Sequence, residues 1–516
     1  MQLTRRIFFK RSAALVAATA LPSWLSETLL AQTMQPIRRY NVNTTDTVGK
    51  ASIRAYREAV AVLKARKDHD PSSWVWWANI HGYPGQRSNP EGEYERVFPA
   101  AGIPGLSEPE RQRLNRLARE TWRKCPHGSE IFLPWHRVYL HVFERMLQGA
   151  IGEPTLAIPY WDWTHQRELP AVFSEPIGGS VTNNPLFEAS RNYGRNSPGE
   201  QRIVFRDNEV SVEFLTEPTL DDRLDETPAG IEVGFSPFLE GGPHGNVHVG
   251  VGGQMGGIER AARDPVFWTH HCNVDRLWES WTRLPDHVNP QSPRATAWLN
   301  QEHKFPQPDG NVKGLTTQQV LVAARIMAGA YEYEKYEQLE GVQVAGKDDA
   351  GGSAARPATA PRGQVAPASV ARTEPVSLSN APATVKLDTS ASQFGPAALA
   401  PGAKLYLGFR SLTADKPVGD NFAVYINLPP GATPDQSSGY LAGNVNFFGA
   451  PPSGPTPAGA HQHSVDRLID ITVLMSKLAA EGKWSGEALT ITIVPVAGGV
   501  EADAKPQIDM IELIRR

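Results

Sequence analysis

The placement of histidine along the chain is the feature that most constrains its fold. The 516 residues include 14 histidines, and several of them fall into two clusters that are far apart in sequence. The first cluster is His81, His127 and His136, and the second is His244, His248 and the pair His270-His271. Imidazole is a ligand for copper, zinc, iron and nickel. One such histidine alone is most simply a hydrogen-bonded core residue, so a metal site requires a fold that brings them together.

Helical periodicity orients the first cluster. His136 opens a helix, with Pro134 just before or within its first turn. The apolar face of this helix is Tyr139, Val142, Phe143, Met146 and Leu147. His127 lies on the preceding loop, from which it can fold back toward His136.

The second cluster also follows a helical pattern. His244 and His248 are four residues apart, which places both imidazoles on one helical face. Further along, Trp268, His271, Asp275 and Trp278 share a face. We therefore expect His271 rather than His270 to point with the buried stripe, and Asp275 to orient a ligating ring from outside the ligand set.

Length and composition indicate two folded units. A chain of this length exceeds what one hydrophobic core usually organises, and 40% hydrophobic residues with 13 Trp supply a large core. An amphipathic helix is expected over 51–66, with Ile53, Tyr56, Val60 and Leu63 on one face. A Gly, Ala, Pro and Ser-rich segment at 341–383 predicts a flexible linker. Runs at 404–409, 422–428 and 489–494 predict strands. The fold class is thus a mainly α catalytic domain over 36–340, a helical bundle holding the metals, followed by a small antiparallel β domain over 384–516.

The first residues differ in kind from the rest. Arg5-Arg6 precedes the apolar stretch 13–18, the pattern of a twin-arginine export signal, expected to cover 1–31. The stretch is too short to span a bilayer, so we expect a periplasmic or secreted protein with no membrane partner beyond the export machinery. The net charge of -4 and the lack of a basic stripe argue against a nucleic-acid partner.

Together the two histidine blocks resemble the copper A and copper B signatures of tyrosinases, catechol oxidases and molluscan haemocyanins, the type 3 dicopper proteins. The resemblance covers about residues 76–281 and is closest to plant polyphenol oxidases over 256–278, while the β-rich tail resembles the extension of plant-type enzymes. It implies that His81, His127 and His136 bind one copper ion and that His244, His248 and His271 bind the other. It also implies dioxygen as co-substrate, a small phenolic substrate, and oxidation of o-diphenols (catechols) to o-quinones, with monophenol hydroxylation as a further activity.

The resemblance also assigns four positions around the metals. Glu240 matches an acidic residue that positions a water, and an ordinary surface carboxylate is the alternative. Gly245 stands where strongly monophenol-active members often carry Asn, which favours diphenol oxidation. Ile258 replaces a gating Phe and predicts a wider entrance, and Phe267 is placed to stack on the substrate ring. In this family the tail can cover the active-site mouth, so Phe447 or Phe448 is expected to supply a plugging side chain.

The only two cysteines are Cys125 and Cys272. Cys125 stands two residues before His127, the arrangement in which fungal tyrosinases and molluscan haemocyanins carry a thioether from the sulfur to the imidazole, and such a cross-link is expected here. The alternatives are a buried thiol and a disulfide with Cys272.

Two other functions compete with oxidation. Haemocyanins share the same histidines, so a reversible dioxygen carrier is the alternative within the family. A zinc hydrolase built on His244 and His248 is the alternative outside it. That reading lacks the glutamate that would act as the base, because Gly245 follows the first histidine.

Overall fold

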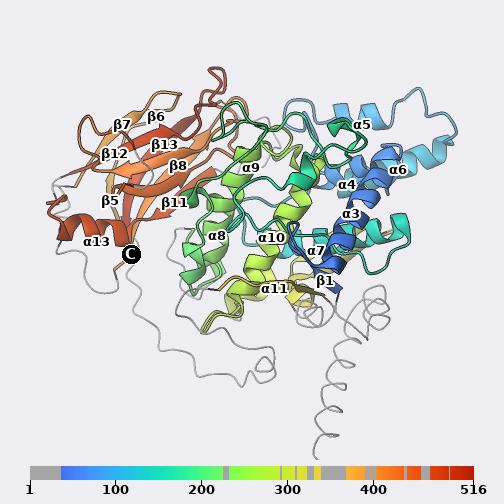
Figure 1. Ribbon diagram of the computed structural model, residues 1–516, viewed down its shortest axis with the longest axis horizontal. Helices are drawn as coiled ribbons and strands as arrows, with labels where there is room; N and C mark the ends of the chain where they lie inside the picture. The colour runs from blue at the N-terminus through green and yellow to red at the C-terminus, as the bar shows by residue number, and fades with distance from the viewer. Residues whose placement is uncertain are drawn as a thin grey trace, which may run out of the picture.

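The structure is a computed structural model that describes residues 37–224, 232–290, 293–307, 311–321, 331–338, 368–389, 395–396, 403–434, 438–454, 465–486 and 488–516. Most helices gather in one half of the molecule, and the two larger sheets lie in the other half together with α13 (Figure 1). The expected export signal and the histidines at 461 and 463 lie outside the described residues.

The helical half is built around the long helices α3 (Thr47–Ala65), α7 (Phe132–Ile151) and α10 (Pro265–Trp281). Aromatic rings fill the space between them, and Phe143 of α7 stacks on Trp268 of α10 with ring centroids 3.5 Å apart. Shorter helices surround this core: α4 (Trp74–His81), α5 (Gly92–Val97), α6 (Glu108–Thr121), α8 (Phe235–Leu239), α9 (Gly245–Val251) and α11 (Thr296–Asn300). The strand pairs are β1 (Ile37–Arg39) with β4 (Tyr331–Tyr333) and β2 (Glu302–Pro306) with β3 (Val312–Thr316).

Short turns of helix connect these elements. They are η1 (Ala171–Phe173), η2 (Val181–Asn183), η3 (Asp207–Glu209), η4 (Glu213–Thr216), η5 (Asp222–Leu224), the π-helical turn η6 (Glu240–His244), η7 (Ala261–Arg263) and η8 (Pro293–Ala295).

Side-chain caps set where two of the long helices begin. Helix α3 starts at Thr47, four residues before the predicted start, because the Asp46 side chain accepts hydrogen bonds from the amides of Val48 and Gly49. The four apolar positions predicted for its inner face are buried: Ile53, Tyr56, Val60 and Leu63. Helix α10 starts at Pro265, and the Asp264 side chain caps it.

Burial along α10 corrects one expectation. Almost the whole helix is buried, Glu279 being the exception. His270 is therefore as inaccessible as His271: 0% of the surface of His270 and 1% of the surface of His271 are exposed. A helix that is surrounded on all sides has no single buried stripe, and the periodicity argument for His271 over His270 fails for that reason.

The C-terminal half is a pair of antiparallel sheets that enclose one apolar core. One sheet has the order β10 (Leu441–Val445), β9 (Phe422–Ile426), β12 (Ala488–Pro495) and β7 (Ala383–Asp388). The other has the order β11 (Val465–Asp470), β8 (Leu405–Thr413), β13 (Gln507–Arg515) and β5 (Ala368–Arg372), with β6 (Val376–Ser377) also paired to β13. Both sheets and helix α13 (Thr472–Ala480) contribute to the shared core. The three predicted strand runs are confirmed in β8, β9 and β12.

The predicted linker extends too far toward the C-terminus. Two strands, β5 and β6, lie inside the 341–383 segment. They form because both pair with β13 and because Val376 is buried in the β core. Pairing with a strand more than a hundred residues later outweighs a local composition typical of a flexible segment.

Asp275 has a structural role that differs from the expected one. Its carboxylate accepts hydrogen bonds from Arg137 Nε at 2.6 Å, from Arg39 Nη1 at 3.4 Å, and from the hydroxyls of Tyr331 at 3.1 Å and Tyr333 at 2.6 Å. None of these partners is a histidine. Asp275 therefore ties α10 to α7, β1 and β4, and the helical spacing that suggested a ligand contact instead points the carboxylate into this buried ion cluster.

His141 of α7 is predicted to make the stability of the protein sensitive to acid. Its two ring nitrogens are buried and make no hydrogen bond within the described residues. Burial, with further contributions from Arg145 and Arg39, lowers the pKa of His141 to about 3. An unfolded histidine binds its proton near pH 6.5, so the stabilising effect of the neutral ring is complete above that pH and is lost as the pH falls toward 3.

We expect His141→Leu to reduce the loss of stability at acid pH. Between pH 6.5 and about 4, the free energy of unfolding of the wild type should fall more steeply than that of the variant, by up to ~1.4 kcal/mol per pH unit. Urea unfolding at a series of pH values measures both slopes. Parallel curves would show that His141 does not contribute.

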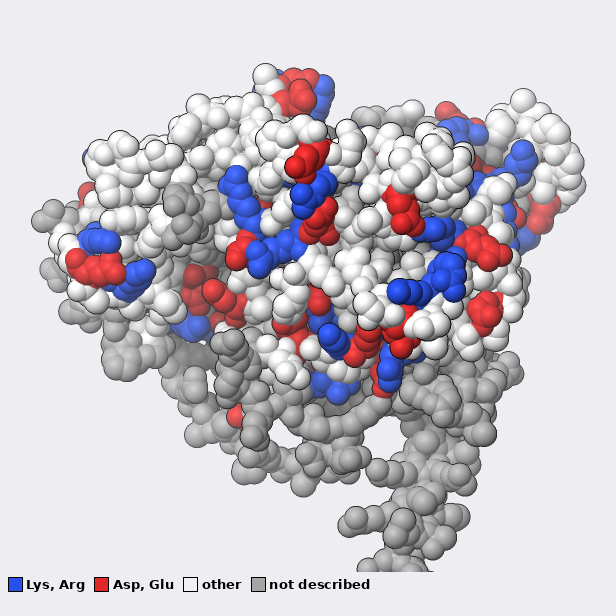
Figure 2. Space-filling view, in the orientation of Figure 1, with Lys and Arg blue, Asp and Glu red and all other residues white. Residues whose placement is uncertain are grey.

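The surface carries mixed charge on the face shown in Figure 2, where Lys or Arg side chains stand beside Asp or Glu in small groups. Exposed ion pairs are also present, such as Arg202 with Glu168 at 2.6 Å. Among the described residues, no helix combines the length and apolar character needed to cross a membrane.

Candidate metal centre

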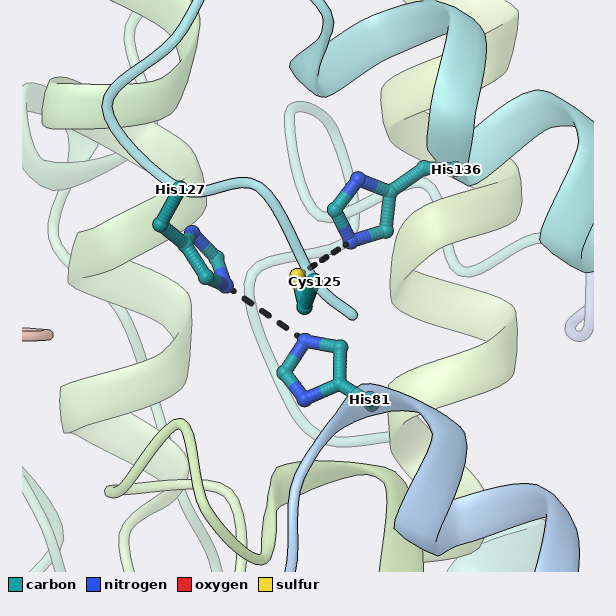
Figure 3. A group of neighbouring side chains, drawn as sticks. All are labelled: His81, Cys125, His127 and His136. Atoms are coloured by element: carbon teal, nitrogen blue, oxygen red, sulfur yellow. Dashed lines mark hydrogen bonds between the residues drawn. The ribbon is translucent and has the colours of Figure 1, made fainter. Parts of the chain in front are cut away.

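The first histidine cluster converges from three separate segments. His81 ends α4, His127 lies on the loop before α7, and His136 is in the second turn of α7 (Figure 3). Nε2 of His81 lies 3.4 Å from Nε2 of His127, and Nε2 of His136 lies 3.4 Å from Sγ of Cys125. The ligand atoms of these four residues all lie within 4.8 Å of one another. The predicted first triad is therefore brought together.

The second cluster forms around α9 and α10. His244 closes the π-helical turn η6 and His248 lies one turn further on, with their ring centroids 4.6 Å apart. Nε2 of His248 lies 3.4 Å from Nε2 of His271. The ligand atoms of His244, His248, His270 and His271 also lie within 4.8 Å of one another.

The two clusters face each other directly. The rings of His136 and His271 are stacked, with centroids 4.3 Å apart and an interplanar angle of 6°. The centroids of His127 and His244 are 5.7 Å apart. The six histidines singled out in the sequence thus form one compact group, which is the arrangement needed for a pair of metal ions.

Outer hydrogen bonds hold five of the six rings with Nδ1 pointing away from the centre. Nδ1 donates to the carbonyl of Ile258 in His81 (2.9 Å), of Phe132 in His136 (2.8 Å), of Glu240 in His244 (3.0 Å) and of Met255 in His248 (2.9 Å). In His127, Nδ1 faces the Glu240 carboxylate at 3.1 Å. A carbonyl oxygen only accepts hydrogen bonds. In each neutral ring whose Nδ1 contacts a carbonyl, Nδ1 therefore carries the proton and Nε2 has none.

Bare Nε2 atoms face one another inside the group. His81 Nε2 and His127 Nε2 are 3.4 Å apart, and neither carries a proton if both Nδ1 atoms donate outward. Two lone pairs at this separation repel unless a cation lies between or beside them. The donor set therefore fits metal ions bound through Nε2, with backbone carbonyls fixing the tautomer as in other metal-binding histidines.

Burial keeps these rings neutral. It is the largest cause of the pKa values well below 6.5 for His81, His136, His244, His248 and His271, and neighbouring imidazoles lower them further. The neutral imidazole is the form that binds a metal. The site is therefore ready to bind cations at neutral pH without first losing protons.

Three of the four positions that the resemblance assigns around the metals make contacts that the sequence did not reveal. Glu240 accepts from the amide of Gly128 at 2.7 Å as well as facing His127, so its carboxylate orients a predicted ligand. Ile258 provides the carbonyl for His81. Phe267 is fully buried and packs against the rings of His81 and His271 at 4.8 and 4.3 Å. Contact of Phe267 with a substrate stays a prediction.

The C-terminal half reaches this centre through Phe448. Its ring stacks on His248, with centroids 4.1 Å apart and planes at 15°, and meets His127 and His244 edge-on. Phe447 instead packs in the β core against Phe422. Of the two phenylalanines expected as a plug, Phe448 is the one that contacts the histidines.

Both cysteines are free thiols, so the disulfide alternative is not present. Cys125 lies within the first histidine cluster, and burial raises the pKa of its thiol. Cys272 is also buried, and the charged groups that act on it are Arg39, Glu144 and Asp275 rather than the histidines. Cys125 therefore remains available for the expected bond to His127.

His270 was not among the six predicted ligands, but its ring also lies in the second histidine cluster. Its ring is fully buried, 4.8 Å from that of His248 and 5.3 Å from that of His244. Neither ring nitrogen has a hydrogen-bond partner within the described residues. The adjacent His271 was the available signal, because neighbouring residues of a fully buried helix both face protein.

The helical half thus brings together two histidine clusters that could hold metal ions. Residues 71–284 match the family described as the common central domain of tyrosinase, and residues 364–516 match a domain of unknown function, DUF7868. Residues 71–284 are therefore similar to the central domain of tyrosinases and polyphenol oxidases, a family that implies a dicopper centre.

Several relatives carry such names. The chain is 30% identical over 301 residues to tyrosinase HcTyr1 of Hahella sp. (strain CCB-MM4), covering 52% of this chain and 59% of that protein. It is 28% identical over 276 residues to the latent form of chloroplastic polyphenol oxidase of Prunus armeniaca, covering 48% and 41%. It is 35% identical over 178 residues to a tyrosinase of Streptomyces glaucescens, covering 30% and 64%. The chain spans about half the length of the relatives it matches.

Solved structures share the fold across both halves. Latent apple tyrosinase aligns with a TM-score of 0.57 at 21% identity, over 93% of this chain and 97% of that one. A latent aurone synthase, a polyphenol oxidase, aligns with a TM-score of 0.55 at 21% identity, over 93% and 89%. At this identity the likeness shows the fold alone.

Proposed function

We propose that this chain is a dicopper oxidase that converts o-diphenols to o-quinones with dioxygen. In this proposal, one copper ion is bound by His81, His127 and His136, and the other by His244, His248 and His271. The observation that carries it is the convergence of these six rings with their Nε2 atoms facing one centre. Bound copper ions would supply the electron transfer to dioxygen and polarise the phenolic oxygen.

The chain's own residues contribute binding and orientation. His248 offers a flat face on which Phe448 already stacks, and a phenol ring is the natural occupant of the same face once Phe448 leaves. Each o-diphenol gives up two electrons and two protons, so two substrate molecules reduce one dioxygen to two waters. Holding the ring beside the metals makes this a positioned step rather than a collision.

A preference for o-diphenols is part of the proposal. Hydroxylation of a monophenol requires a base that removes the phenolic proton before the oxygen binds copper. Glu240 is the nearest candidate, but its Oε1 faces His127 and accepts from Gly128. Gly245 offers no side chain to hold a water beside it. Catechols therefore fit this site better than tyrosine.

Oxygen consumption with 4-methylcatechol and with tyrosine tests the proposal. The protein is loaded with copper and assayed as the full chain and after proteolysis between its two halves. The proposal predicts oxygen uptake and a yellow quinone with 4-methylcatechol, and a much slower rate with tyrosine. Reversible oxygen binding that leaves 4-methylcatechol unchanged in both forms would instead establish a carrier, and zinc in place of copper would revive the hydrolase reading.

The position of Phe448 on His248 predicts that the full chain is largely inactive until its C-terminal half moves. Because this ring occupies the face of His248, Phe448→Ala is expected to raise the rate with 4-methylcatechol on the order of tenfold. Steady-state oxygen uptake by the uncut chain measures the effect. Phe447→Leu is the matched control, since that ring lies in the β core. Equal rates for the wild type and Phe448→Ala would contradict the plug.

The thioether and export remain proposals of the same kind. Cys125 is expected to be bonded to a ring carbon of His127, which would fix a ligand borne on a loop. Mass spectrometry after reduction and alkylation should find Cys272 modified and Cys125 unmodified.

Export by the twin-arginine pathway predicts that replacing Arg5 and Arg6 by Lys retains the protein inside the cell.

A further inference from the structure

Gly245 has no backbone reason to be glycine. It is the first residue of α9 and has φ −64° and ψ −38°, which are ordinary helical values for any residue. Glycine lowers helix stability relative to alanine. The absence of a side chain at this position, next to the predicted ligand His244, therefore needs an explanation from packing.

The side chain of Asn446 fills the space beside Gly245. A Cβ atom at position 245 would lie 2.5 Å from Oδ1, 2.8 Å from Nδ2 and 2.9 Å from Cγ of Asn446. Real Cβ atoms do not tolerate such distances. Any residue other than glycine at 245 would thus displace Asn446, which follows β10 in the C-terminal half.

Asn446 connects the helical half to the loop that carries Phe448. Its Nδ2 donates to the carbonyl of Gly241 at 2.8 Å and to Oδ1 of Asn246 at 2.9 Å. Its Oδ1 accepts from the amide of Phe448 at 3.2 Å and from Arg467 Nη2 at 3.2 Å. The amide is fully buried and satisfied on both sides, so it fixes Phe448 relative to α9.

The contact surface behind Asn446 is polar rather than apolar. Asn421 of the C-terminal half donates to Glu209 Oε1 at 2.7 Å and to the carbonyl of Asn246 at 3.1 Å. Asn246 in turn donates to the carbonyl of Glu209 at 2.9 Å. Polar contacts between domains are typical of surfaces that separate, and each bond here depends on exact placement of an amide.

We propose that Asn446, seated against the bare Cα of Gly245, is the lock that holds Phe448 over the metal centre. Asn446 is a positioning residue, and the lack of a side chain at Gly245 leaves the space that its amide occupies. The residue after His244 therefore controls the docking of the C-terminal half, in addition to any effect on the substrate. This inference rests on the proposed function only where oxidation is used to report opening.

Asn446→Ala in the full copper-loaded chain tests the lock. Loss of the hydrogen bonds to Gly241, Gly242 and Asn246 of the helical half, together with the bond from the Phe448 amide, is expected to raise hydrogen exchange at that amide, and the rate with 4-methylcatechol, about tenfold or more. Asn444→Ala is the matched control, because Asn444 lies two residues earlier, is buried, and has neither amide atom hydrogen-bonded within the described residues. Asn444→Ala should leave both readouts at the wild-type level.

A second variant keeps the test decisive if Asn446→Ala disturbs folding. Gly245→Ala should raise exchange at Phe448 by displacing Asn446, and the double variant should exchange no faster than the faster single variant, because both remove one contact. Equal exchange at Phe448 in wild type, Asn446→Ala and Gly245→Ala would overturn the lock. Raised exchange without oxidation in any variant would support the lock and refute the proposed function.

Discussion

Replacing His271 by alanine is expected to abolish catechol oxidation and to lower the copper content of the protein from two ions toward one. His271 stacks on His136 of the first cluster, and its Nε2 lies 3.4 Å from that of His248 in the second. It therefore contacts both halves of the proposed centre. Outer partners of metal ligands already contribute ~10–100-fold to affinity or activity, so loss of a ligand should cost more than a hundredfold.

Copper analysis and oxygen uptake on the same preparation measure the two effects of His271→Ala. His141→Leu is the matched control, because His141 is also a neutral histidine on a long helix but belongs to neither cluster. It should retain both copper ions and the wild-type rate. Full activity in His271→Ala, or loss of copper from His141→Leu as well, would contradict the assignment.

Asp275→Ala is expected to destabilise the helical half by about 3–5 kcal/mol, because it removes the carboxylate shared by two buried guanidinium groups and leaves buried positive charge less well compensated. The side chains of Arg39 and Arg137 are 1% and 5% exposed. Burial opposes ionisation of Asp275, but Arg137 and Arg39 outweigh it and hold the pKa of the carboxyl below its usual value. The carboxylate is thus charged at neutral pH, and its removal leaves Arg39 with Glu144 and Arg137 with Glu279 as their remaining carboxylate partners.

Denaturant unfolding, followed by tryptophan fluorescence, measures this loss. Glu110→Ala removes an exposed partner of Arg113 and should leave the midpoint near that of the wild type. If Asp275 instead oriented a metal ligand, Asp275→Ala would lower copper affinity while stability stayed close to that of the wild type. That outcome would restore the role expected from the helical spacing.

Local sequence patterns predicted most of the elements that carry the centre. The four-residue spacing of His244 and His248 predicted neighbouring rings on one helical face, and their centroids are 4.6 Å apart. The apolar face of α3 and the strands β8, β9 and β12 were also predicted from local patterns. For the helices, the relevant contact is made within one element or within one turn of it.

Contacts between distant segments were not predictable in the same way. The partners of Asp275 come from α7, β1 and β4, and the occupant of the space beside Gly245 comes from a residue two hundred positions later. The strands β5 and β6 form in a segment of linker-like composition because β13 is there to pair with them. Spacing along one helix says which face a residue occupies, and it does not say what packs against that face.

The most direct test of the dicopper assignment is anomalous X-ray diffraction at the copper edge from crystals of the copper-loaded protein. The account predicts two peaks, one within reach of Nε2 of His81, His127 and His136, and one within reach of Nε2 of His244, His248 and His271. A single peak, or copper bound away from these rings, would contradict it.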